Sequence, residues 1–210
     1  MVSKVDICNY ALQELGADTI TSLNEKTTSA NECKLRYESC RRSLLQMHLW
    51  NFAIKRVALN KDASTPAFNY GNEFTLPADF LYSVMTGLEE QFQSGTSQVV
   101  NSNLYVHDVP SYGGVDKYRI EGKKLLSYDD NVNLVYVADI EDTQQFSATF
   151  VELLARWIAV KIAFRLTGSR GERDTQLQIF ERELAEYQSI DSQQGVFNRL
   201  EVSGFLSEYF

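Results

Sequence analysis

Residues 150–164 read FVELLARWIAVKIAF, the longest and most apolar helical pattern in this chain of 210 residues. Large apolar side chains recur there at the 3.6-residue spacing of an α-helix. The pattern is made by Phe150, Leu153, Leu154, Trp157, Val160, Lys161 and Phe164. Gly168 follows, and glycine often ends a helix because it adopts a left-handed backbone without a steric penalty. We therefore predict a helix that begins after Asp142 and ends at Gly168.

A short helix is predicted near the N-terminus, over residues 3–15. Ser3 and Asp6 have the spacing of a capping box, and Gly16 follows the last apolar position. One face of this helix carries Cys8, Ala11, Leu12 and Leu15.

Two more helices are predicted, one after each of the two helices above. One has Ser29 as its N-cap, with Glu32 three residues on, and runs to about residues 47–50. Its expected buried face consists of Cys33, Tyr37, Cys40, Leu44 and Met47. The other covers residues 171–188. Its apolar stripe consists of Leu177, Phe180, Leu184 and Tyr187.

The middle of the chain has the shorter apolar runs that are typical of β-strands. We predict strands at residues 54–59, 73–76, 82–85, 99–106, 118–121, 124–127 and 133–137. Gly122 and residues 129–131 supply the turns between the last three strands. Residues 89–116 are polar and rich in serine, asparagine and glycine, which favours long exposed loops.

The order of elements is helix, helix, strands, helix, helix and tail, which predicts an α+β fold. We expect residues 1–52 and 143–188 to form a helical bundle platform from the N- and C-terminal helices. Residues 53–142 then form an inserted antiparallel β domain, and residues 189–210 an extended C-terminal docking tail. The two connections between platform and inserted domain should be neighbours in space.

Composition limits the classes of function. The chain carries 28 acidic and 20 basic residues, a net charge of -8, which disfavours a protein that binds nucleic acid by neutralising phosphates. A conduit for DNA is compatible with this charge, because repulsion helps DNA slide. No stretch approaches the roughly 18 apolar residues of a membrane span. Residues 1–6 lack the pattern of a secretory signal, so we expect a cytoplasmic protein with no membrane partner.

The sequence gives little support for a metal site or for a catalytic nucleophile. The cysteines and histidines are Cys8, Cys33, Cys40, His48 and His107. Cys33 and Cys40 lie about 10 Å apart along one predicted helix, too far for a disulfide within it. His48 follows Cys40 by too many residues for a compact zinc site. The chain also has no Gly-x-Ser-x-Gly and no glycine-rich phosphate loop, so we expect no metal, no cofactor and no catalytic residue.

Neighbouring carboxylates leave one enzymatic alternative open. They are Glu89 and Glu90, Asp129 and Asp130, and Asp139, Glu141 and Asp142. Two such groups several ångströms apart are what a muralytic hydrolase, an enzyme that cleaves peptidoglycan, uses. We favour turn and loop roles for them, with Asp142 stabilising a helix N-terminus. A monomeric binding module is the other alternative.

An ordered series of motifs runs through the N-terminal part of the chain. In order they are Asp6-x-Cys8-Asn9-x-Ala11-Leu12-x-x-Leu15-Gly16; Ile20 and Leu23; Ala30, Tyr37 and Arg41; Trp50-Asn51-Phe52-Ala53; Leu59; and Leu76-Pro77-x-Asp79, with weaker counterparts at residues 118–122 and 150–167. This series resembles the tail tubular protein A family, the head-to-tail adaptors of short-tailed bacteriophages. The Trp-Asn-Phe-Ala motif is its clearest member.

The resemblance implies a structural virion protein and no enzyme. It implies a homo-oligomeric ring of about twelve copies, whose partners are the portal protein on one side and the tail nozzle protein on the other. DNA would pass through the central channel without specific binding. The subunit would be assembled in the host cytoplasm and reside at the portal vertex of the virion.

Trp50, Asn51 and Phe52 mark the expected junction between helices and strands. The two aromatic side chains either face a partner or wedge the two parts of the fold together. We favour the wedge, because aromatic residues dominate core packing. Asn51 would then satisfy backbone groups at the junction.

The C-terminal tail is the expected binding element for the portal or a neighbouring subunit. Its apolar residues are Phe197, Leu200, Val202, Phe205, Leu206, Tyr209 and Phe210. From Val202 on they follow helical spacing, but nine residues do not hold a helix in water unaided. Burying five of these side chains yields roughly 7–15 kcal/mol, while ordering nine residues costs roughly 9–18 kcal/mol. Repeated display of the tail on a ring raises its effective concentration, which offsets the cost of ordering it. The alternative is that the tail is a disordered terminus.

Overall fold

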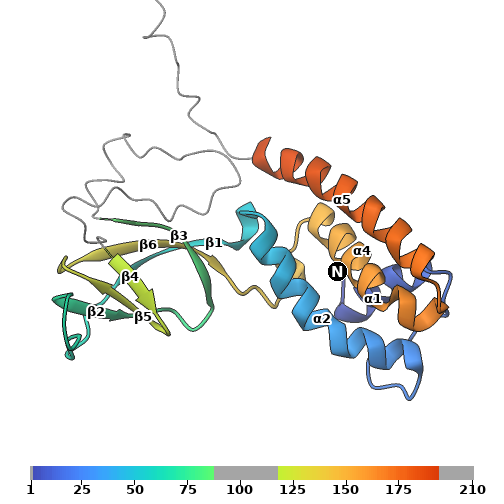
Figure 1. Cartoon of the computed structure of the whole chain (residues 1–210), viewed down its shortest axis with the longest axis horizontal. Helices are drawn as coiled ribbons and strands as arrows, with labels where there is room; N and C mark the ends of the chain where they lie inside the picture. The colour runs from blue at the N-terminus through green and yellow to red at the C-terminus, as the bar shows by residue number, and fades with distance from the viewer. Residues whose placement is uncertain (1, 88–117, 194–210) are drawn as a thin grey trace, which may run out of the picture.

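The computed structural model describes residues 2–87 and 118–193 of the chain. Helices lie at one end and two small antiparallel sheets at the other (Figure 1). The helices are α1 (Lys4–Glu14), α2 (Thr28–Met47), α4 (Ala148–Thr167) and α5 (Arg170–Gln193), with the 3-10 helices η1 (Asn51–Ala53) and η2 (Thr143–Gln145). The strands are β1 (Ile54–Leu59), β2 (Asn72–Thr75), β3 (Phe80–Gly87), β4 (Tyr118–Glu121), β5 (Lys124–Ser127) and β6 (Val132–Ala138). The predicted α+β class is confirmed.

Helix α4 is the centre of the helical part, and α1, α2 and α5 each pack against it. Ser147 caps its N-terminus by accepting a hydrogen bond of 3.2 Å from the backbone N–H of Phe150. Gly168 ends it with a φ of 68°, as predicted. The predicted start was wrong: the residues after Asp142 form η2, because the extended backbone at Phe146 separates η2 from α4.

Helix α1 begins with the predicted capping box. The backbone N–H of Asp6 donates to Ser3 Oγ at 3.2 Å, and the backbone N–H of Ser3 donates to the Asp6 carboxylate at 2.8 Å. These bonds lower the pKa of Asp6, because they favour its charged form. The chain leaves the helix at Gly16, which has a φ of 62°.

Helix α2 ends at Met47, within the predicted range, but its N-cap and the burial of Met47 differ from the prediction. Thr27, not Ser29, is the N-cap, and it accepts from the backbone N–H of Ala30 at 3.2 Å. With this earlier start, the side chain of Ala30 is buried in the core. At the other end Met47 is 38% exposed, and Leu45 is buried in its place. The backbone becomes extended directly after Met47, so its side chain leaves the buried face.

Helix α5 is longer than predicted and packs along α4. It ends at Gln193 instead of residue 188, and its buried stripe continues to Asp191. Phe180 is buried and stacks on Trp157 with ring centroids 4.5 Å apart. The rest of the predicted stripe is half-buried against the core, namely Leu177, Leu184 and Tyr187.

The strands form two three-stranded antiparallel sheets with orders β1-β6-β3 and β2-β5-β4. Each predicted strand within the described residues is present, and its bounds either match the prediction or differ from it by one or two residues at each end. Gly122 makes the turn between β4 and β5 with a φ of 60°. The strand predicted at residues 99–106 lies outside the described residues.

The two connections between helices and strands lie side by side, as predicted. Ile54, which follows η1, pairs with Val137 near the end of β6. Buried apolar side chains form one continuous core from α1 through the sheets to α5. The division of the chain into platform and inserted domain stays a prediction.

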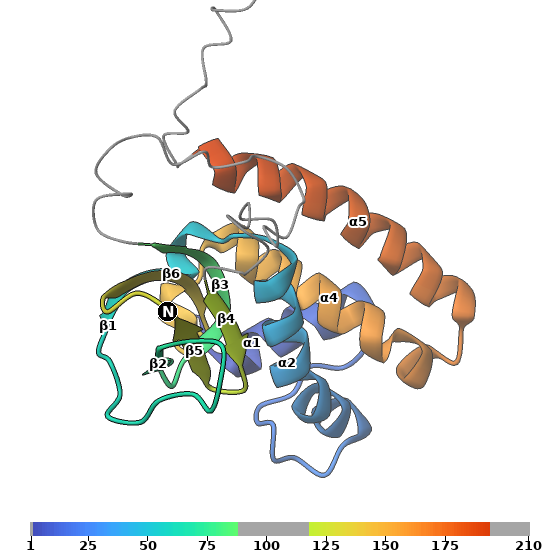
Figure 2. The same cartoon turned by 60° about the vertical axis from the view of Figure 1, so that its left-hand side comes forward.

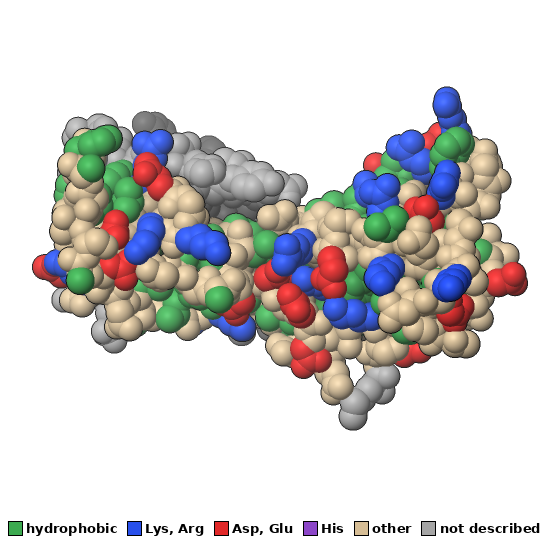
Figure 3. Space-filling view, turned by 90° about the horizontal axis from the view of Figure 1, so that it is seen from below, with side chains coloured by type: hydrophobic (Ala, Val, Ile, Leu, Met, Phe, Trp, Pro, Cys, Tyr) green, Lys and Arg blue, Asp and Glu red, His purple; other side chains and the backbone are tan. Residues whose placement is uncertain are grey.

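The surface carries charges of both signs. Figure 3 shows Lys, Arg, Asp and Glu side chains intermixed over the face seen from below, with a mixed cluster at the waist between the helices and the sheets. Among the described helices, none is both long and apolar enough to cross a membrane.

Candidate functional site at the helix–strand junction

An aromatic cluster fills the junction between helices and strands. The ring of Phe150 lies at its centre, with the centroids of Trp50, Phe52 and Phe146 at 5.2, 5.0 and 4.8 Å. Trp50 has no exposed surface. Its indole N–H donates to the backbone carbonyl of Leu44 at 2.9 Å. That carbonyl is one of the last four of α2, which have no partner within the helix, so Trp50 both packs the core and caps α2.

Asn51 ties this junction to the end of α5. Its backbone N–H donates to the Asp191 carboxylate at 3.2 Å, and its side-chain amide donates to the backbone carbonyl of Asp191 at 2.6 Å. His48 Nε2 lies 3.2 Å from the same carboxylate. Asn51 thus bonds a backbone group, but that group belongs to α5 and not to a strand.

Burial sets the charge of His48 in this arrangement. Removal from water lowers the pKa of His48, and the nearby Asp191 carboxylate only partly offsets that effect. The neutral ring then donates its Nε2–H to Asp191. Asp191 was not among the predicted junction residues, because the predicted helix ended at residue 188, whereas α5 continues to Gln193. The signal was present, since Asp191 continues the helical spacing of Phe180 and Tyr187, but a carboxylate does not extend an apolar pattern.

Arg41 fixes α2 to the chain that leaves β6. Its guanidinium is fully buried and donates to Asp139 at 2.5 Å and to the backbone carbonyl of Ile140 at 2.6 Å. A third bond of 3.0 Å reaches Glu38, and Arg42 lies 2.8 Å from the other oxygen of Asp139. Burial alone would lower the pKa of Arg41, but its bonds to Asp139 and Glu38 raise it. The contact joins residues far apart in the sequence.

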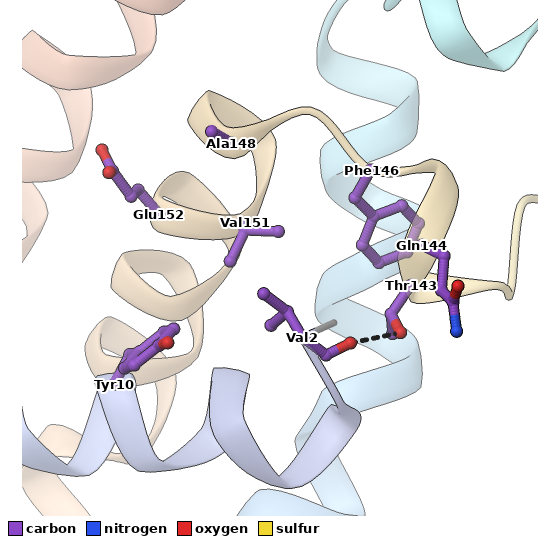
Figure 4. A pocket seen from close by; sticks show the side chains of 8 residues that line it. All are labelled: Val2, Tyr10, Thr143, Gln144, Phe146, Ala148, Val151 and Glu152. Carbon is purple, nitrogen blue, oxygen red and sulfur yellow. Dashed lines mark hydrogen bonds between the residues drawn. The ribbon is translucent and has the colours of Figure 1, made fainter.

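A hollow of about 510 Å³ opens beside the aromatic cluster (Figure 4). Its lining consists of Val2, Tyr10, Thr143, Gln144, Phe146, Ala148, Val151 and Glu152. Thr143 Oγ1 donates to the backbone carbonyl of Val2 at 2.6 Å, which holds the start of the chain against η2. Tyr10 is 44% exposed on one side. The hollow is mostly apolar and has room for a large side chain of a partner.

The described residues contain no group of three or more His, Cys, Asp or Glu side chains arranged to hold a metal ion. Cys8, Cys33 and Cys40 are buried and free. Burial raises the pKa of the Cys40 thiol to about 11. His48 is bonded to Asp191 rather than to either cysteine of the zinc set considered above.

The carboxylates considered for hydrolysis lie in three different settings. Asp139 binds Arg41 and Arg42, as described above. Asp142 caps η2 by accepting from the backbone N–H of Gln144 at 3.0 Å. Asp130 lies 2.9 Å from the ammonium group of Lys61. Glu89, Glu90 and His107 lie outside the described residues.

The seven apolar residues expected to bind the portal or a neighbour, Phe197 to Phe210, also lie outside the described residues. The structure does fix the point at which their segment begins, because α5 ends at Gln193, two residues past Asp191. Comparison with protein-family models and with curated proteins returns no match to this chain.

Proposed function

We propose that this protein is an adaptor subunit that joins the head of a short-tailed bacteriophage to its tail. About twelve copies form a ring between the portal protein and the tail nozzle protein, and DNA passes through its channel without specific binding. The task is geometric and involves no reaction, metal, cofactor or membrane. The subunit assembles in the host cytoplasm and resides at the portal vertex.

One observation carries the proposal: Asn51, at the centre of the motif that resembles the adaptor family, holds the last turn of α5 through Asp191. The C-terminal segment therefore starts from a fixed point on the junction. A binding segment on a rigid base loses less freedom on docking than one on a loose base. A ring of such subunits would present its segments in one regular array.

The buried Arg41 supports the same function. Its bonds to Asp139 and Ile140 hold α2 against the chain that leaves β6. An adaptor has one partner at each end and needs a fixed distance between the two contact surfaces. Rigid coupling between the helices and the sheets provides that distance.

Electron microscopy of the purified protein mixed with the portal of the same phage tests this proposal. We expect rings of added density on one end of the portal. Replacing Phe205, Leu206 and Tyr209 with serine should abolish attachment, because it removes the apolar side of the segment. A matched control replaces the polar residues Asn198, Ser203 and Ser207 with alanine and should attach normally.

Two results would overturn the proposal. One is a scattering mass of a single chain in the presence of portal at all concentrations tested. The other is a cleared zone on peptidoglycan that disappears with an Asp139 or Glu141 alanine variant, which would identify a hydrolase.

A further inference from the structure

One face of α4 lies between α2 and α5 (Figures 1 and 2). Trp157, Lys161 and Phe164 lie on this face, which we call the α4 strip. Trp157 is half-buried: its indole N–H donates to Ser43 Oγ of α2 at 2.9 Å, and its ring stacks on Phe180 of α5. Beyond it Lys161 is exposed, and Phe164 is 49% exposed. The strip thus opens towards the C-terminal end of α4.

Cations lie directly on the aromatic rings of the strip. The ammonium group of Lys161 is 3.9 Å from the centroid of the Trp157 ring. The guanidinium of Arg170, at the start of α5, is 5.9 Å from the centroid of the Phe164 ring. Phe180 and Lys161 therefore cover the two faces of the Trp157 ring, whereas the ring of Phe164 presents an exposed apolar surface beside the positive charge of Arg170.

More positive charge borders the strip on the side of α2. Arg165 is 73% exposed while it pairs with Glu32 at 3.3 Å. Asp174 and Glu181, seven residues apart, are acidic residues that helical spacing places on one face of α5. Lys161, Arg165 and Arg170 supply the positive charge of the strip, in a chain whose net charge is -8.

The C-terminal segment has the complementary chemistry. Residues 200–210 contain Glu201 and Glu208 and no Lys or Arg. They also contain the apolar residues Leu200, Val202, Phe205, Leu206, Tyr209 and Phe210. An acidic, aromatic-rich segment fits a strip of aromatic rings bordered by cations.

The segment is long enough to reach the strip of its own chain. From Phe180, which stacks on Trp157, to Gln193 the helix α5 rises about 20 Å. Residues 194–199, which link α5 to the docking residues, span about 20 Å when extended, which is enough to bring residue 200 to the level of Trp157. A tether of this length gives an effective concentration in the millimolar range, which favours the strip of the same chain over that of another.

We propose that residues 200–210 dock on the α4 strip of the same chain, with their aromatic side chains on Phe164 and near half-buried Trp157, and their carboxylates beside Lys161 and Arg165. In this state the apolar segment is covered in the free subunit. A partner must displace it from the strip before it binds the segment. This inference goes beyond the adaptor proposal and does not depend on it, because it needs only one chain.

Quenching of a bimane label by tryptophan tests the docking in the full-length chain. The label is attached at Ser207→Cys, and the unsubstituted chain reports background labelling of the buried native cysteines. We expect bimane fluorescence to be quenched, and Trp157→Phe to restore it. Lys161→Glu and Phe164→Ser should each restore it too. Both replace exposed side chains, and circular dichroism checks that every variant is folded.

The same assay separates the possible occupants of the strip. Quenching within one chain does not change on dilution or on addition of excess unlabelled chain. Loss of quenching in either case would overturn the proposal in favour of docking between copies. Absence of quenching in the folded chain, or full quenching in the folded Trp157→Phe and Lys161→Glu variants, would overturn docking on the strip altogether.

Discussion

Replacing Trp50 with alanine should lower the free energy of unfolding by about 3–5 kcal/mol, the range for truncating a buried aromatic side chain. Trp50 has no exposed surface, and its ring packs at the edge of Phe150 with centroids 5.2 Å apart. The loss has two parts. Alanine leaves a cavity in the junction, and the carbonyl of Leu44 loses the indole N–H as its donor, which costs about 1–3 kcal/mol for a buried group.

Phenylalanine at position 50 separates the two parts. Trp50→Phe keeps most of the ring but removes the donor to Leu44, so it should cost about 1–3 kcal/mol. Phe68→Ala is the matched control, because the ring of Phe68 is 77% exposed. We expect the control to change stability by about 0.5 kcal/mol or less.

Urea unfolding followed by far-ultraviolet circular dichroism measures these differences, since the signal does not depend on Trp50 itself. The midpoint should fall without a change in slope, because the surface exposed on unfolding stays nearly the same. A cost below about 1 kcal/mol for Trp50→Ala would refute the role of Trp50 as the wedge of the junction. Equal costs for Trp50→Phe and Trp50→Ala would instead assign the whole effect to the capping bond.

Three further predictions concern the junction and α4. Arg41→Ala should cost about 3–5 kcal/mol in urea unfolding, because it leaves the partly buried Asp139 without its main partner; a loss near zero would contradict this. Burial holds the pKa of His48 below the ordinary value of 6.5. The stability that neutral His48 contributes is therefore present above pH 6.5 and is lost as the pH falls through the lowered pKa. Stability measured by urea unfolding from about pH 7.5 to pH 5 should therefore decline, and His48→Asn should flatten that decline; an unchanged decline in the variant would contradict this. Gly168→Ala should cost about 1 kcal/mol in a thermal melt, since its φ of 68° disfavours a side chain although there is open space around it.

Local patterns determined the type of most described elements. The apolar spacing of residues 150–164 predicted α4, Ser3 with Asp6 predicted the start of α1, and Gly168 predicted the end of α4. Such signals act between residues close in the chain, so they can be read without knowing the fold. These local signals predicted the wrong N-cap for α2, because two neighbouring residues are nearly equal candidates. Thr27 and Ser29 are both good N-caps, and the burial of Ala30 goes with a start at Thr28.

Only the tertiary structure decided which distant residues meet. The sequence gives no sign that Arg41 binds Asp139 or that Asn51 binds Asp191, because each pair is separated by many residues and neither fits a periodic pattern. The open strip on α4 was equally hidden, since Phe164 has the same spacing as the buried residues of its helix. Helical periodicity assigns a residue to a face of its helix. Whether another element covers that face depends on how α2 and α5 pack, and that is set by the whole chain.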